Sequence, residues 1–238
     1  MTFVLPAPDT MPTGDFPAGL SYTAYAAYGT LGAPAAQSDR VVAVATVIDA
    51  LAEGVRHSVV IRGAYDTSGY RADCQLLLWF AGPTADCLQG QLTGLRGPLR
   101  DLGLAAFWSA LGVQREAEFN RRHVPAYYAG EPARDYVCVY PFVRTPEWYV
   151  LPAERRREML AEHGALGRRF PDVRANTTSA FGLGDYEWLL AFEADDVVRI
   201  VDLIHTLRAS DARLYTKNEL PFITGRRKPL EEILGALT

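Results

Sequence analysis

Polar and apolar residues alternate along several short stretches of this chain, and the segments between them place apolar residues at helical spacing. Residues 136–144 read YVCVYPFVR, so successive side chains point to opposite faces of an extended strand. Farther along, Met159, His163 and Leu166 occur at i, i+4 and i+7, which puts them on one face of a helix. The pattern predicts a strand followed by a helix whose apolar face carries a histidine.

The same two patterns predict six elements in each half of the chain. In the first half we expect strands at 20–28, 57–66, 74–82 and 104–117 and helices at 37–54 and 84–101. In the second half we expect strands at 136–144, 174–181, 187–194 and 217–224 and helices at 153–168 and 195–209. The order strand, helix, strand, strand, helix, strand is the ferredoxin-like pattern. Residues 1–19, rich in Pro, Gly and Asp, are expected to form an irregular arm.

An internal repeat supports this division. The segment LLLWFAGPTADCLQGQLTGLR, which ends at Arg96, resembles WLLAFEADDVVRIVDLIHTLR, which ends at Arg208, and matching residues keep one constant offset. We therefore expect an α+β fold with a structural ferredoxin-like half at 20–120 and a functional one at 121–238. Together the two halves would form a dimeric α+β barrel within one chain.

Composition limits the kind of protein. At 238 residues and 49% hydrophobic, the chain can bury one large core or two small ones. A net charge of −4 leaves no broad excess of Lys and Arg for phosphates, so we expect no nucleic-acid partner. The longest apolar run, 41–55, is interrupted by Asp49 and Glu53, and no basic region followed by an apolar stretch opens the chain. We expect a cytoplasmic protein that inserts no segment into a membrane.

Three cysteines, Cys74, Cys87 and Cys138, are an odd number without CxxC spacing. Neither a disulfide framework nor a zinc site is indicated.

The strand at 136–144 and the helix after it bring together the residues with the most reactive side chains. Tyr140 and Arg144 share one face of the strand, and His163 faces inward from the helix. Spacing alone leaves two interpretations open, because a histidine on an apolar helix face is often only a hydrogen-bonded core residue and most strand tyrosines only pack. The offset of the repeat matches Tyr140 with Tyr28 and His163 with Leu51. Since leucine cannot bind a metal, the second half is the better candidate for an active copy.

Longer motifs favour the functional interpretation. The segment YPFVRTPEWYVLP, which begins at Tyr140, is followed by His163 in EMLAEHGALGRRF and later by DARLYTKNELPFITG, and together these resemble the chlorite dismutase superfamily. The segment FNRRHVPAYYAGEP places His123 before Tyr140 and resembles the actinobacterial branch of the coproheme decarboxylases, the hydrogen-peroxide-dependent haem synthases. The similarity extends from about Leu20 onward.

The resemblance implies a reaction and a role for each candidate residue. Enzymes of this branch use hydrogen peroxide to decarboxylate two propionates of iron-coproporphyrin III (coproheme), which serves as both substrate and cofactor. The product is haem b, reached through a three-propionate intermediate. By resemblance His163 is the proximal iron ligand, Tyr140 is the catalytic tyrosine whose radical removes hydrogen from a propionate, and His123 is the distal base. The residues expected to hold the propionates are Arg144, Trp148 and Arg213.

The resemblance also implies partners and leaves alternatives. Family members commonly form homopentamers, and a transient contact with ferrochelatase is expected. Chlorite dismutases carry a distal arginine about a dozen positions after the proximal histidine, where this chain has Ala175 and Asn176, with Arg174 close by. A chlorite dismutase or peroxidase of the same fold is therefore disfavoured. A non-catalytic haem carrier remains as an alternative of another class, which would need His163 and the pocket arginines but no tyrosine on the pocket face.

Overall fold

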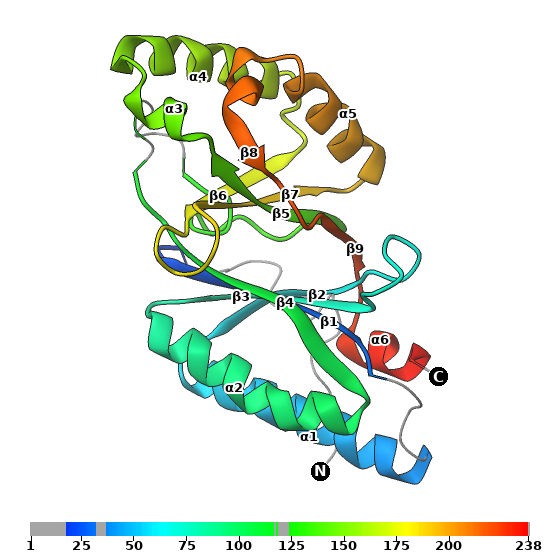
Figure 1. Cartoon of the computed structure of the whole chain (residues 1–238). Helices are drawn as coiled ribbons and strands as arrows, with labels where there is room; N and C mark the ends of the chain where they lie inside the picture. The colour runs from blue at the N-terminus through cyan, green and yellow to red at the C-terminus, as the bar shows by residue number, and fades with distance from the viewer. Residues whose placement is uncertain (1–17, 32–36, 117, 119–123, 238) are drawn as a thin grey trace.

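In a computed structural model, which describes residues 18–31, 37–116, 118 and 124–237, the chain forms two antiparallel sheets joined edge to edge. Neighbouring strands follow the order β7-β6-β4-β1-β3-β2-β9-β5, and β5 pairs again with β7, so the strands close into a barrel. Figure 1 shows α1 and α2 below one sheet and α4 and α5 above the other. The expected α+β barrel of two ferredoxin-like halves is confirmed.

The first half contributes the strand order β4-β1-β3-β2. Its elements are β1 (Tyr22–Thr30), α1 (Gln37–Arg56), β2 (Val60–Asp66), β3 (Leu76–Gly82), α2 (Ala85–Asp101) and β4 (Leu104–Val113). The core between this sheet and its helices also takes in the C-terminal helix α6 (Leu230–Ala236). The last residues of the chain therefore pack against the first half.

The second half repeats the order as β9-β5-β7-β6. Its elements are β5 (Tyr136–Arg144), α3 (Pro146–Val150), α4 (Ala153–Gly167), β6 (Arg174–Ser179), β7 (Trp188–Ala194), α5 (Val197–Leu207), the 3-10 helix η1 (Asp211–Tyr215), β8 (Thr216–Asn218) and β9 (Ile223–Arg227). The predicted boundary between the halves, after residue 120, lies outside the described residues.

The repeat seen in the sequence is present in the structure. Strand β3 starts at Leu76 and β7 at Trp188, and helix α2 starts at Ala85 and α5 at Val197. Both pairs have the same separation along the chain, which is also the offset of the sequence repeat. Even the N-caps of the two helices correspond: the side chain of Thr84 accepts from the backbone of Cys87, and that of Asp196 accepts from the backbone of Val198. These caps satisfy backbone donors that each helix start would otherwise leave unpaired.

The region after α5 differs from prediction. The expected strand 217–224 is two strands, β8 and β9, which pair with different parts of β5. Between them lie Glu219 and Pro221, and a proline has no N–H to give to a ladder. Helices α3, η1 and α6 were not predicted, because each is too short to show a helical period.

Strand β5 separates the barrel interior from the layer that faces the helices. Val137 and Val139 belong to the apolar cluster inside the barrel, whereas Cys138 and Tyr140 belong to the cluster between the sheet and α5. The predicted alternation is confirmed. It directs every second side chain of β5 away from the barrel and toward α4 and α5.

An ion pair is buried inside the barrel. Arg62 and Glu193 have fully buried side chains whose shortest contact, from Nη2 to Oε2, is 2.6 Å. Arg62 also donates to the carbonyl of Glu131, and Asn176 donates to Glu193. We expect Glu193→Ala to lower the free energy of unfolding by about 3–5 kcal/mol, because it removes the carboxylate that balances the charge of a buried guanidinium.

Urea unfolding monitored by circular dichroism would measure this change. The matched control is Asp172→Ala, which removes one carboxylate from an exposed ion pair with Arg199. The control should lower the free energy of unfolding far less, because water replaces the lost contact. Equal costs for the two variants would contradict the assigned importance of the buried pair.

Among the helices of the described chain, none combines the length and the apolar character needed to cross a membrane.

Candidate active site

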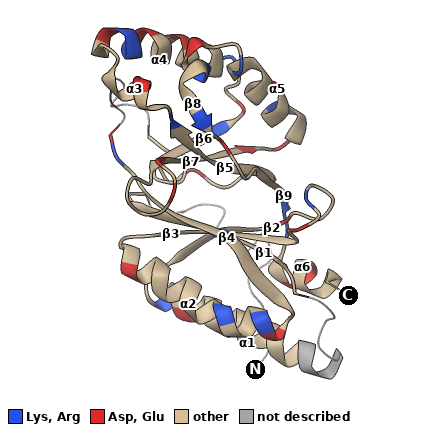
Figure 2. Cartoon of the chain, viewed as in Figure 1, with Lys and Arg blue, Asp and Glu red and all other residues tan. Residues whose placement is uncertain are grey.

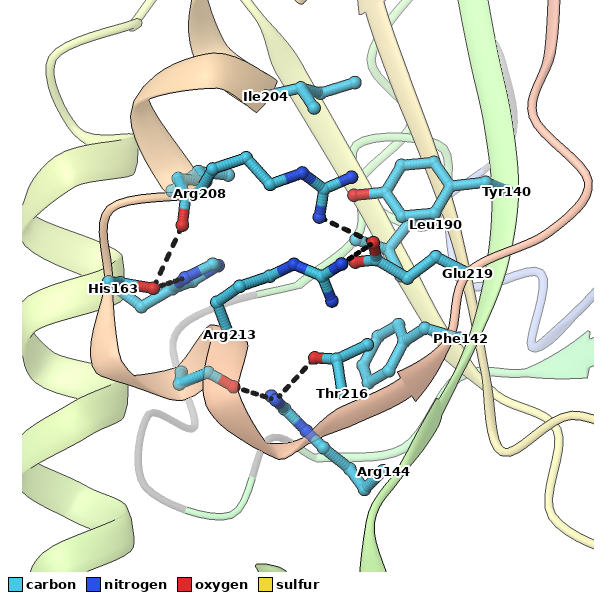
Figure 3. Close-up of a pocket in the computed structure, with 13 residues that line it drawn as sticks. Tyr140, Phe142, Arg144, His163, Leu190, Ile204, Arg208, Arg213, Thr216 and Glu219 are labelled. Atoms are coloured by element: carbon cyan, nitrogen blue, oxygen red, sulfur yellow. Dashed lines mark hydrogen bonds and ion pairs between the residues drawn. The ribbon is translucent and has the colours of Figure 1, made fainter.

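A cavity lies between the outer face of the second sheet and the layer formed by α4, α5 and η1. Its volume is about 470 Å³, counting the part open to solvent. Figure 3 shows His163 on α4 at one side and Tyr140 on β5 at the other, with arginine side chains between them. The residues that line the cavity are Tyr140, Phe142, Arg144, His163, Leu190, Ile204, Leu207, Arg208, Ser210, Ala212, Arg213, Thr216 and Glu219.

Helix α4 presents His163 to this cavity. The helix follows Pro152, whose backbone geometry suits a helix start. Met159, one turn before His163, is buried against Trp148 and Ala212 and fixes the rotation of the helix. The prediction that His163 lies on the inward face is confirmed.

The hydrogen-bond partner of His163 indicates which ring nitrogen carries the proton. Nδ1 lies 3.0 Å from Oγ of Ser210, and that hydroxyl donates its hydrogen to the carbonyl of Leu207 at 3.1 Å. Because a serine hydroxyl has one hydrogen, Ser210 accepts here and Nδ1 of His163 is the donor. In the neutral ring Nε2 then keeps its lone pair, which is the form that can bind a metal.

Electrostatics favour that neutral form. Burial lowers the pKa of His163 below its ordinary value, and the positive charge of Arg144 lowers it further. The unfolded chain takes up a proton near pH 6.5, whereas the folded imidazole stays neutral to a lower pH. Nε2 of His163 is therefore available as a ligand at neutral pH and somewhat below.

Tyr140 is 5% exposed and packed among aromatic rings. Its ring stacks on Phe222 at 4.4 Å between centroids and lies 6.0 Å from Phe192. Burial raises the pKa of the phenol far above its ordinary value, and the nearby Cys138 and Glu219 contribute in the same direction. The phenol therefore keeps its proton, and its oxidation requires the proton to leave along with the electron.

Arg144 lies beside the cavity at the end of β5. Its guanidinium donates to the carbonyl of Ala212 at 2.8 Å and approaches Oγ1 of Thr216 at 3.4 Å. Burial lowers its pKa, but a guanidinium remains charged in proteins. A fixed positive charge therefore borders the cavity.

Trp148 does not line the cavity. It is 5% exposed, and its ring lies under the guanidinium of Arg144 at 4.2 Å. The tryptophan packs against Met159 and Tyr215, which join α3, α4 and η1 into one small core. In this arrangement Trp148 packs against Arg144 on the side away from the cavity, whereas a direct contact between Trp148 and a propionate was expected.

Arg213 lines the cavity, as expected, together with a cluster that sequence reasoning missed. Arg208 donates to Glu219 at 2.6 Å, and Arg213 lies 3.3 Å from the same carboxylate. Figure 2 shows acidic and basic residues interspersed along α4 and basic residues at and around β8. The match of Arg208 to Arg96 in the repeat indicated only a shared structural position. Nothing local to Glu219 indicated that it would meet both arginines.

The other side of the expected site is only partly described. His123 lies outside the described residues, so its position is not part of the structure. Asn176 faces the barrel interior, where it donates to Glu193, and only Ala175 belongs to the layer facing α5. Of the two counterparts named from the sequence, only Ala175 therefore faces the layer that contains the cavity, because consecutive residues of a strand point to opposite faces.

Arg174, the nearest arginine to that position, is paired with Glu131 at 2.7 Å. It is not among the residues that line the cavity.

Comparisons with known proteins identify the family. The model of the chlorite dismutase family matches residues 38–228. The chain is 49% identical over 184 residues to the coproheme decarboxylase of Mycolicibacterium smegmatis, covering 75% of this chain and 78% of that one. The chain therefore belongs to the chlorite dismutase family.

Solved structures agree with the fold. A variant of the chlorite dismutase from Candidatus Nitrospira defluvii superposes with a TM-score of 0.80 at 20% identity, over 92% of this chain and 95% of that one. The same protein in complex with imidazole superposes with a TM-score of 0.79 at 19% identity, over 92% and 95%.

Proposed function

We propose that this protein is a coproheme decarboxylase that converts coproheme to haem b with hydrogen peroxide. The observation that carries the proposal is a cavity with a metal-competent histidine on one side, a buried tyrosine on the other and arginines between them, in a chain 49% identical to a coproheme decarboxylase. An iron porphyrin with four carboxylates needs these three kinds of group.

His163 would hold the iron of the substrate. Its Nε2 carries the free lone pair, and Ser210 fixes the ring by accepting from Nδ1. This arrangement is typical of metal-binding histidines, whose second nitrogen is usually held by a hydrogen-bond acceptor. The iron, when bound, supplies the redox chemistry with peroxide, as cofactor-borne reactions generally require.

Tyr140 would remove the hydrogen from the substrate. Once its phenol has been oxidised to a phenoxyl radical at the expense of hydrogen peroxide, Tyr140 would take one hydrogen atom from the β-carbon of a propionate. The substrate radical would then give a second electron to the remaining oxidising equivalent of the peroxide, as CO₂ departs and a vinyl group forms. Each round consumes one hydrogen peroxide and one proton and releases one CO₂ and two waters. Two rounds, through a three-propionate intermediate, give haem b.

The arginines would hold the carboxylates. Guanidinium pairs with carboxylate through two parallel hydrogen bonds, so Arg144 and Arg213 are suited to bind propionates. Trp148 would act by positioning Arg144, against which it stacks. His123 would accept a proton from peroxide, because an imidazole can do so near neutral pH.

We expect Ser210→Ala to weaken the binding of ferric coproheme about 10-fold or more, because the acceptor that orients His163 is lost. Absorbance titration of the Soret band would measure the dissociation constant. The matched control is Thr216→Val, which removes a hydroxyl 3.4 Å from Arg144 without touching His163. Equal weakening in both variants would argue against the assigned role of Ser210 in orienting His163.

Two assays on one preparation distinguish this function from its rivals. With coproheme and peroxide, chromatography of the extracted porphyrin should show haem b. With chlorite, an oxygen electrode should show negligible O₂ release. O₂ release without decarboxylation would instead indicate a chlorite dismutase, and neither reaction in a protein that binds haem would indicate a carrier.

We further propose that the protein assembles as a homopentamer, acts in the cytoplasm and receives coproheme from ferrochelatase in a transient contact. The family resemblance supports these proposals, and an enzyme that inserts iron into coproporphyrin must supply the substrate. Light scattering during gel filtration would test the assembly.

We likewise propose that residues 121–238 form the coproheme-binding half and 20–120 the structural half.

A further inference from the structure

One carboxylate of the chain occupies the centre of the basic cluster. Nη1 of Arg208 lies 2.6 Å from Oε2 of Glu219, and Nη2 of Arg213 lies 3.3 Å from the same oxygen. The side chain of Glu219 is 14% exposed, whereas those of the two arginines are 36% and 39% exposed. The three side chains come from the end of α5, from η1 and from the segment after β8, and they converge at the cavity (Figure 3).

The chemistry of Glu219 matches that of the proposed substrate. Beyond its Cα, a glutamate side chain is –CH₂–CH₂–COO⁻, which is the same group as a porphyrin propionate. Arg208 donates a charge-assisted hydrogen bond to the Glu219 carboxylate, and Arg213 adds an ion pair with the same oxygen. Of the cavity-lining residues, Glu219 is the one with a carboxylate.

We propose that Glu219 stands in for a substrate propionate, holding Arg208 and Arg213 in place until an incoming carboxylate takes them over. The inference rests on the proposed function, since it requires a substrate with propionates. Binding is then an exchange of carboxylates: Glu219 orients the two guanidiniums in the free enzyme and competes with the substrate for them. A porphyrin without carboxylates at this point gains nothing from the exchange.

The competition predicts tighter binding when Glu219 loses its charge. Glutamine keeps the shape of glutamate but accepts more weakly from guanidinium. We therefore expect Glu219→Gln to lower the dissociation constant for ferric coproheme about 3- to 10-fold, measured by quenching of tryptophan fluorescence.

The matched control is Asp211→Asn, which removes a carboxylate from the neighbouring η1. Asp211 pairs with Arg155 of α4, which is not a cavity-lining residue. It should leave the dissociation constant within about twofold of the wild type, because the charge lost is equal but no cavity arginine is freed. If Asp211→Asn lowered the dissociation constant as much as Glu219→Gln does, net charge alone would explain the effect, and the proposal would be overturned.

A double variant without the two arginines distinguishes competition between Glu219 and the substrate from simple charge repulsion between them. In a chain carrying Arg208→Gln and Arg213→Gln, the Glu219→Gln change should have no further effect, because there is nothing left to compete for. Persistent tightening would show that Glu219 only repels the substrate at a distance. Weaker binding of the single Glu219→Gln variant would show that it does no more than orient the arginines. Either result would overturn the proposal.

Wild-type activity keeps this test distinct from that of the proposed function. If the wild type binds and decarboxylates coproheme while Glu219→Gln binds it no more tightly, only the role of Glu219 fails. If the wild type neither binds nor converts coproheme, the proposed function fails and the exchange fails with it. Thermal melting of each variant would confirm that all are folded.

Discussion

Replacing Tyr140 with phenylalanine should abolish the conversion of coproheme while leaving its binding nearly unchanged. Phenylalanine keeps the ring that stacks on Phe222 but has no O–H whose hydrogen can be lost and regained. We expect the rate of CO₂ release to fall by at least about 100-fold, the scale typical of removing a group that transfers a proton in the rate-limiting step. Stopped-flow absorbance with peroxide, followed by porphyrin analysis, would measure the rate.

The control for this variant is Tyr136→Phe. Tyr136 lies on the same face of β5, packs against the same cluster and is not a cavity-lining residue. It should retain near wild-type activity. Full activity in Tyr140→Phe would remove the tyrosine from the proposed mechanism, and a matching loss in both variants would indicate damage to the sheet.

Replacing His163 with alanine should weaken the binding of ferric coproheme by at least about 100-fold, since loss of a residue that only orients a metal ligand already costs about 10- to 100-fold. Among the described residues, the half-buried side chain makes one side-chain hydrogen bond, to Ser210, so the fold should persist. Absorbance titration measures the affinity, and the shift of the Soret band reports loss of the nitrogen ligand. Added imidazole should partly restore the spectrum, because it can occupy the space left by the ring.

The control for this variant is His205→Ala, which removes an exposed histidine of α5. Binding by that variant should equal that of the wild type. If His163→Ala bound coproheme as tightly as the control does, the iron would be held by another group and the proposed role of His163 would be wrong.

Local periodicity accounts for the parts of the structure that the sequence predicted correctly. The alternation along β5 places Val137 and Val139 inside the barrel and Tyr140 outside it, because one face of the strand has to pack in each layer. Helical spacing likewise predicted that Met159 and His163 face inward, and in the structure Met159 is buried and His163 lines the cavity. The offset between β3 and β7 is visible in sequence and structure alike.

Contacts between separate short elements account for what was missed. Glu219 meets Arg208 and Arg213 because the chain leaves β8 near the end of α5, a path that no local pattern encodes. Trp148 looked like a wall of the site, but packing among three short segments buries it behind Arg144. Asn176 points into the barrel, where it donates to Glu193 of the neighbouring strand β7, and the sequence pattern of β6 did not show which face would be inside.

The measurement that tests the central claim most directly is mass spectrometry of the porphyrin during a titration of the coproheme-loaded wild-type protein with hydrogen peroxide. The account predicts stepwise loss of two carboxyl groups, with a three-propionate species that rises and falls before haem b accumulates. Bleaching of the porphyrin with all four propionates intact would contradict it.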